Sequence, residues 1–195
     1  EGFTISETII GQNLTRLFRN AKGRVIVATF SSNVHRVQQV INSSITYGRK
    51  VAFSGRSMEK ISQIAMDLGY LKVPKNTIIK LDDIHKYPDN KVTIITTGSQ
   101  GEPMSALSRI ASGSHKNIGL KEGDYIIISA SPIPGNTKLI TKLIDILISK
   151  GAEVIYDAME EVHVSGHACR EELKLIHSLI KPKYFVPVHG EYRHL

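Results

Sequence analysis

Residues 24–33, Arg-Val-Ile-Val-Ala-Thr-Phe-Ser-Ser-Asn, decide the fold. The run 24–30 is almost continuously apolar, which is typical of a strand buried on both faces of a parallel sheet. After the polar turn, Val34, Val37 and Ile41 recur at helical spacing and predict a helix over 34–46. A buried strand that leads through a short turn into an amphipathic helix is the repeating unit of α/β folds.

The same unit recurs along the chain. Further strands are predicted at 51–53, 91–96, 125–129 and 153–156, and further helices at 58–68, 104–111 and 137–149. We expect Ser57 to cap the helix at 58–68 and Gly69 to end it. The alternation predicts an α/β fold with a mostly parallel sheet flanked by helices.

The character of the chain changes after Tyr156. Residues 157–161 are mostly acidic, and histidines cluster from His163 onward. A short helix is predicted over 171–180, followed by a strand over 184–188. We therefore expect one domain over residues 1–157 and a separate segment over residues 158–195.

Composition narrows the functional classes. The net charge of +7 suits a polyanionic partner, although Lys and Arg are scattered. The single cysteine, Cys169, excludes an internal disulfide and any CxxC zinc site, and it fits a reducing, cytoplasmic location. No apolar stretch approaches the ~20 residues of a membrane span, so no membrane association is expected. The start at Glu1, without Met or a leader pattern, indicates part of a longer protein.

Small polar residues gather where the predicted strands end. Five such loops lie at residues 31–33, 54–57, 97–101, 129–132 and 164–167. Hydroxyl and glycine residues let backbone amides approach an anion, and a following helix N-terminus favours negative charge. Each loop alone is more typical of an ordinary turn or helix cap. Together they predict a phosphate-binding edge, and no P-loop or GxGxxG fingerprint is present.

Three histidines differ from the others. His163 and His167 are four residues apart and separated by Ser165-Gly166, which favours a turn that directs both rings to one point. His189 follows the predicted strand 184–188, and an imidazole there could bind a metal. A single histidine cannot hold a metal, and no HxHxDH motif is present. Surface or packing roles are expected for the rest, namely His35, His85, His115, His177 and His194.

Six strings together resemble the ribonuclease J family, in the β-CASP branch of the metallo-β-lactamase-fold nucleases. They cover nearly the whole chain in the family's order, at residues 28–36 (ATFSSNVHR), 55–58 (GRSM), 97–103 (TGSQGEP), 131–136 (SPIPGN), 163–167 (HVSGH) and 187–193 (PVHGEYR).

The resemblance implies that residues 1–157 are a β-CASP domain. Residues 158–195 would return into a metallo-β-lactamase fold. It implies a catalytic role for His167 at the scissile phosphate and metal ligation by His189. It also implies a set of substrate-binding residues, which includes a 5′-monophosphate pocket: Ser31, Ser32, Asn33, His163, Val164, Ser165, Gly166 and His167.

The resemblance further implies an activity and its requirements. The parent enzyme would hydrolyse RNA as a 5′-to-3′ exonuclease and endonuclease, in RNA processing and decay, with a pair of divalent ions (zinc or manganese). Its partners would be single-stranded RNA with a 5′-monophosphate and, in an oligomer, copies of itself or a paralogue. Most metal ligands lie outside this chain, so the chain alone is expected to be inactive. A catalytically silent RNA-binding subunit and a DNA or phosphoester hydrolase on the same fold are the alternatives.

Overall fold

The computed structural model describes residues 2–156, 159, 162–164, 166–188 and 192–193. The chain divides into two compact units. One unit is Ser6–Val164, and the other is Glu1–Ile5 together with Ser165–Leu195. No helix within the described ranges is long and apolar enough to cross a membrane.

The first unit is built on a five-stranded sheet in the order β2-β3-β1-β4-β5, with every neighbouring pair parallel. Its strands are β1 Val25–Ala28, β2 Lys50–Ser54, β3 Val92–Thr96, β4 Tyr125–Ile128 and β5 Glu153–Tyr156. Its helices are α1 Glu7–Asn20, α2 Val34–Thr46, α3 Arg56–Asp67, α4 Ala106–Ser112 and α5 Thr137–Ser149, with 3-10 turns η1 Leu81–Lys86 and η2 Asp89–Lys91. The predicted α/β class is confirmed.

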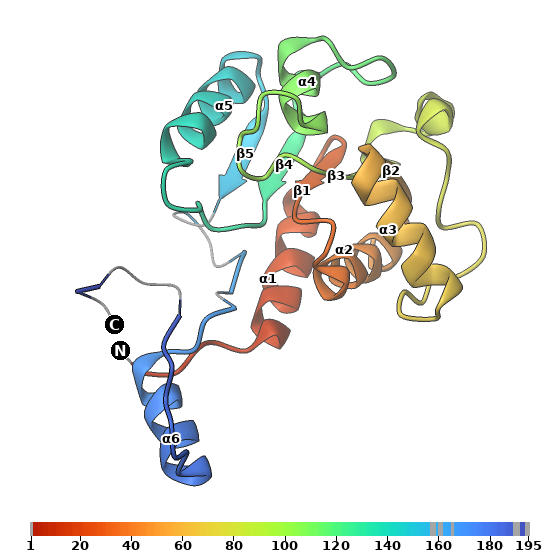
Figure 1. The fold of residues 1–195 in the computed structure, drawn as a ribbon. Helices are drawn as coiled ribbons and strands as arrows, with labels where there is room; N and C mark the ends of the chain where they lie inside the picture. The colour runs from red at the N-terminus through yellow and green to blue at the C-terminus, as the bar shows by residue number, and fades with distance from the viewer. Residues whose placement is uncertain (1, 157–158, 160–161, 165, 189–191, 194–195) are drawn as a thin grey trace. The chain divides into compact units, whose positions relative to one another are not determined.

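Helices cover both faces of the sheet (Figure 1). Alternate residues of each strand contribute to opposite cores, so that Val27 packs with α1, α2 and α3 while Ile26 packs with α4 and α5. β1 lies in the middle of the sheet, and its four residues are fully buried. This explains the continuous apolar run at 25–28, because a central parallel strand exposes neither face.

Two predicted helix starts are wrong by two residues. α3 begins at Arg56 because Gly55, at φ +107°, already turns the chain into the helix. Ser57 therefore lies inside the first turn and does not cap it. α4 begins at Ala106, where the Ser105 hydroxyl accepts a hydrogen bond from the Ser108 amide. The predicted bounds of α2, α5 and β5 are confirmed.

Helix α1 was missed by the sequence analysis, although its signals are present. Ser6 caps it by accepting a hydrogen bond from the Thr8 amide. Ile10, Leu14 and Phe18 recur at helical spacing and are buried in the core that lies over α2 and β1. A serine followed by this period is a standard helix start.

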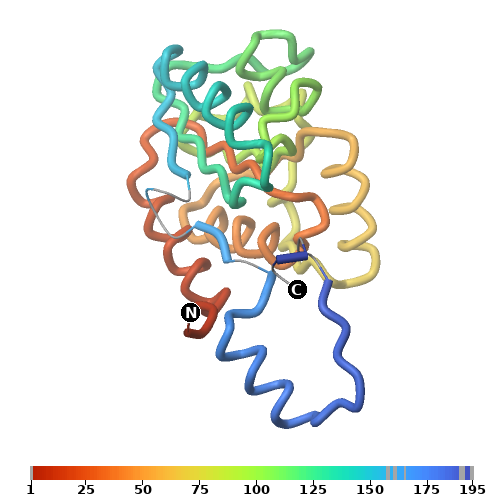
Figure 2. The backbone as a smooth tube through the Cα atoms, turned by 60° about the vertical axis from the view of Figure 1, so that its left-hand side comes forward, coloured from red at the N-terminus to blue at the C-terminus, as the bar shows by residue number. Residues whose placement is uncertain are grey.

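The described residues of the second unit form one helix, α6 Arg170–Ile180. The predicted strand at 184–188 is wrong, because these residues have no strand pairing and run as an extended segment beside α6 (Figure 2). The ring of Phe185 packs edge-on against His177, with centroids 5.7 Å apart. A strand needs a neighbouring strand to satisfy its backbone, and the described part of this unit offers none. A boundary at 157/158 stays a prediction.

Candidate functional site

The loop after β1 presents polar groups at the carboxyl edge of the sheet, in its centre. Ser32 is exposed, and Ser31 is half-buried. The Asn33 side chain is partly committed, because its Oδ1 caps α2 by accepting a hydrogen bond from the Arg36 amide (3.0 Å). Two hydroxyls therefore remain accessible in the predicted substrate-binding stretch 31–33.

The loops after the neighbouring strands are more closed than the sequence analysis expected. Ser54, Ser99 and Ser129, which follow or end β2, β3 and β4, are each at most 2% exposed. The fifth predicted loop, at 164–167, does not follow a strand of the sheet, since β5 ends at Tyr156. The prediction that it lies at a strand end is therefore wrong.

Contacts between neighbouring loops account for this closure. The buried side chain of Gln100, after β3, bonds the β4 loop by donating to the Ser131 carbonyl (3.0 Å) and accepting from the Ile133 amide (2.8 Å). Gly98 has φ +109°, and a Cβ there would lie 2.8 Å from Ser105 Cβ. These contacts brace the β3 and β4 loops, whereas the β1 loop keeps the exposed Ser32 and the half-buried Ser31, and Ser57 is exposed after β2.

The histidine-rich stretch spans both units. In the first unit, His163 and Val164 are half-buried, and Val164 packs against the core beside α1 and α2. In the second unit, Gly166 and His167 are exposed. Ser165 lies outside the described residues. The sequence predicted a turn rather than a helix here, and the described residues of this stretch are indeed not helical.

His167 lies just before the start of α6, in an open hollow of about 500 Å³ that Thr4, Glu172 and Leu175 also line. The Glu172 carboxylate accepts hydrogen bonds from the Thr4 hydroxyl (2.6 Å) and the Cys169 amide (2.7 Å). These bonds, the Thr4 bond foremost, hold the pKa of Glu172 below its usual range. Glu172 thus supports the helix start and is not a free base beside His167.

Metal ligation is not provided by the described residues alone. They contain no group of three His, Cys, Asp or Glu side chains that could hold an ion. A catalytic zinc takes three protein ligands as a rule. His189, the predicted ligand, lies outside the described residues, as does His194. The residues that the structure describes therefore do not by themselves fit a metal pair.

A serine–histidine contact near β2 does not form a nucleophilic pair. His115 Nδ1 accepts hydrogen bonds from the amides of Asn117 (3.2 Å) and Ile118 (3.3 Å), so Nε2 carries the proton and donates to Ser54 Oγ (3.1 Å). A general base would need an unprotonated Nε2. Burial, with the charge of Arg109 second, lowers the pKa of His115 below 6.5. This supports the neutral packing role expected from the sequence.

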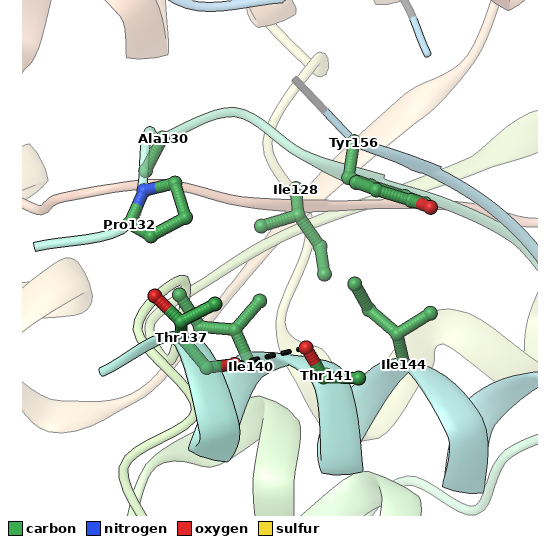
Figure 3. Close-up of a pocket in the computed structure, with 8 residues that line it drawn as sticks. All are labelled: Ile128, Ala130, Pro132, Thr137, Ile140, Thr141, Ile144 and Tyr156. Carbon is green, nitrogen blue, oxygen red and sulfur yellow. Dashed lines mark hydrogen bonds between the residues drawn. The ribbon is translucent and has the colours of Figure 1, made fainter. Parts of the chain in front are cut away.

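An apolar pocket of about 300 Å³ opens between α5 and the ends of β4 and β5 (Figure 3). Its lining is Ile128, Ala130, Pro132, Thr137, Ile140, Thr141, Ile144 and Tyr156. The Thr141 hydroxyl donates to the Thr137 carbonyl (3.0 Å). This lining contains no carboxylate, imidazole or thiol, so the pocket lacks the ligands that hold a catalytic metal.

Comparison with known proteins agrees with this architecture. A family model described as "Ribonuclease J, beta-CASP domain" matches residues 22–147, which is more than half of the chain. A second, described as "Zn-dependent metallo-hydrolase RNA specificity domain", matches residues 151–195. Sequence similarity to individual proteins extends over both regions.

Relatives match over nearly the entire chain. Ribonuclease J of Helicobacter pylori (strain J99) is 52% identical over 194 residues, which is 100% of this chain and 28% of the relative. Ribonuclease J of Thermus thermophilus is 50% identical over 99% of this chain and 34% of its own length. Ribonuclease J2 of Bacillus subtilis (strain 168) is 45% identical over 98% of this chain and 34% of its own length. The chain spans about a third of the length of these curated relatives. It belongs to the ribonuclease J family.

Proposed function

We propose that this chain is the RNA-binding part of a metal-dependent ribonuclease that hydrolyses RNA phosphodiester bonds. The observation that carries the proposal is the match of residues 22–147 and 151–195 to a ribonuclease J domain and an RNA specificity domain. The basic charge of the chain supports a polyanionic substrate. The 5′-to-3′ exonuclease and endonuclease activities, in RNA processing and decay, belong to the whole protein.

The accessible polar groups support specific roles in binding. The exposed Ser32 and half-buried Ser31 would hydrogen-bond phosphate oxygens of the strand, including a 5′-monophosphate. His163, Val164, Ser165 and Gly166 would contact the substrate through the same stretch. His167, which is exposed, would contact the scissile phosphate and hold or transfer a proton there. The substrate would be single-stranded RNA.

Divalent metal use is supported by the description "Zn-dependent metallo-hydrolase" of the model that matches residues 151–195. A bound metal pair, of zinc or manganese, would supply an activated water and neutralise charge on the phosphate. His189 would be this chain's ligand. The remaining ligands would come from the rest of the protein, so the chain alone would be inactive. A cytoplasmic location and an oligomer of like or paralogous subunits complete the proposal.

The test uses the full-length protein that contains this chain. Purified protein is incubated with three substrates, each with and without a chelator. They are single-stranded RNA with a 5′-monophosphate, the same RNA with a 5′-hydroxyl, and single-stranded DNA of the same sequence. The proposal expects chelator-sensitive cleavage of RNA, favoured by the 5′-monophosphate. RNA binding without cleavage would indicate a silent partner subunit, and preferred cleavage of DNA would indicate a DNA hydrolase. Either result would contradict the proposal.

A further inference from the structure

Arg36, in the first turns of α2, is a charged residue with no exposed surface. Its Nη2 donates to both carboxylate oxygens of Glu7 (2.9 Å each), and its Nε donates to Gln39 Oε1 (2.9 Å). Its Nη1 donates to Ser129 Oγ and to the backbone carbonyl of Val162. We call these five groups the Arg36 network.

Burial of this guanidinium is costly without such partners. Removing an ion from water costs several kcal/mol, and apolar residues of similar volume are often at least as stabilising as a buried ion pair. On the same helix, Val37, Val40 and Ile41 fill the core as fully buried apolar side chains. Core packing therefore does not require an arginine at position 36. What an apolar residue could not provide is the set of directed hydrogen bonds.

Two bonds of the network, one from Arg36 and one from Ser129, end on the carbonyl of Val162. Residues 162–164 belong to no helix or strand, so this carbonyl has no place in a backbone ladder. It accepts from two side chains, Arg36 Nη1 and Ser129 Oγ, the latter at 2.5 Å. The Val162 side chain is itself fully buried. Both the backbone and the side chain of Val162 are therefore fixed.

The same arginine is tied to the β1 loop through its backbone, because its amide donates to Asn33 Oδ1 (3.0 Å). Arg36 thus connects the end of the predicted substrate stretch 31–33 to the residue that directly precedes His163. Ser129 connects both to the end of β4.

We propose that Arg36 and Ser129 are positioning residues that fix where the stretch 163–167 leaves the sheet domain relative to the β1 loop. The consequence is that His163 and Val164, which follow Val162 in the same unit, hold a fixed position relative to Ser31 and Ser32 of the β1 loop. This inference rests on the proposed function for its effect on catalysis. The fixed position of the Val162 backbone does not depend on the proposed function.

The test compares Ser129→Ala with Ser44→Ala in the full-length protein. Both serines are fully buried, but the hydrogen bond of Ser44 Oγ runs to the Val40 carbonyl within α2, whereas that of Ser129 Oγ runs to the Val162 carbonyl. Hydrogen exchange is measured on peptides that span 162–168. Loss of one hydrogen bond to a buried carbonyl is expected to speed exchange there about five- to tenfold in Ser129→Ala, and not in Ser44→Ala. Arg36→Lys, which keeps the charge but loses the fork geometry, should do the same.

Activity is the second readout. Ser129→Ala should lower kcat/KM on 5′-monophosphorylated RNA by roughly ten- to a hundredfold with unchanged metal content, as expected for a misplaced substrate stretch. Unchanged exchange at 162–168, or equal acceleration in Ser44→Ala, would overturn the positioning inference. Faster exchange with unchanged activity would retain the fixed backbone but contradict both its catalytic effect and the proposed use of 163–167.

Discussion

Arg24 and Asp124 form a two-point ion pair at the amino edge of the sheet, with Nε to Oδ1 at 2.8 Å and Nη2 to Oδ2 at 2.6 Å. Both side chains are at most 4% exposed. They precede β1 and β4 directly, so the pair joins two neighbouring strands at their amino ends.

Removal of one partner of this ion pair should destabilise the fold far more than removal of both. Asp124→Ala leaves a buried, unpaired guanidinium and should lower the free energy of unfolding by about 3–5 kcal/mol. The double variant Arg24→Met/Asp124→Leu should recover most of that loss. Urea unfolding of the three proteins measures it. A double variant as unstable as Asp124→Ala would show that the fold needs the pair's hydrogen bonds, not only its neutrality.

The braced loops predict a graded effect of alanine at glycine positions. Gly98→Ala combines a positive φ with a collision against the side chain of Ser105, whose Cβ would lie 2.8 Å away, and should cost more than ~2 kcal/mol. Gly135 has φ +95° but open space around it, so Gly135→Ala should cost only ~1 kcal/mol. Gly119→Ala, with an ordinary φ and open space, should stay within ~0.5 kcal/mol. Equal melting temperatures for Gly98→Ala and Gly119→Ala would contradict the loop packing.

His115 should make the stability of the fold depend on pH. Its pKa is lowered in the folded state from 6.5, so the unfolded chain binds the proton more tightly. The stabilising contribution is therefore complete above pH 6.5 and is lost as pH falls through the folded-state pKa. Between pH 7.5 and pH 5, the free energy of unfolding should fall more for the natural protein than for His115→Gln. His85→Gln, an exposed site, is the control. An NMR titration midpoint for His115 above 6.5 would contradict this environment.

The salt dependence of RNA binding distinguishes phosphate contacts made by charged side chains from those made by neutral hydroxyls. Each phosphate neutralised by Lys or Arg should contribute a slope of about −0.7 to log K against log salt for single-stranded RNA. The double variant Ser31→Ala/Ser32→Ala should weaken binding without changing that slope, because hydroxyls release no counterions. Ser149→Ala removes an exposed hydroxyl at the end of α5, outside the predicted edge, and should change neither quantity. Binding is measured on the metal-free full-length protein to prevent cleavage. An affinity that does not depend on salt would contradict phosphate recognition.

Much of the fold could be predicted because its signals are local. The apolar runs of β1 and β5 and the helical periods of α2 and α5 reflect burial that each segment shows by itself. The false strand at 184–188 had the composition of a strand, but pairing depends on a neighbour that no local pattern reveals. Sequence reasoning also placed hydroxyls at strand ends without showing that Ser54 and Ser129 are buried.

The Arg36 network shows the same limit more clearly. Arg36 lies inside the motif 28–36, yet its partners Glu7, Ser129 and Val162 are 29, 93 and 126 residues away in sequence. A charged residue on the apolar face of a predicted helix was the one available signal. Its partners could be identified only once the fold had brought α1, β4 and residue 162 together.

We propose that His167 acts on the RNA phosphate while the metal is held by other residues. The most direct test is the single-turnover cleavage rate of full-length His167→Ala, measured together with its metal content and melting temperature. We predict unchanged metal content and melting temperature, with a rate lowered by ~10²–10⁴-fold, the scale of general acid–base catalysis. His189→Ala should instead lose metal. Loss of metal from His167→Ala, or a rate equal to that of the natural protein, would contradict the account.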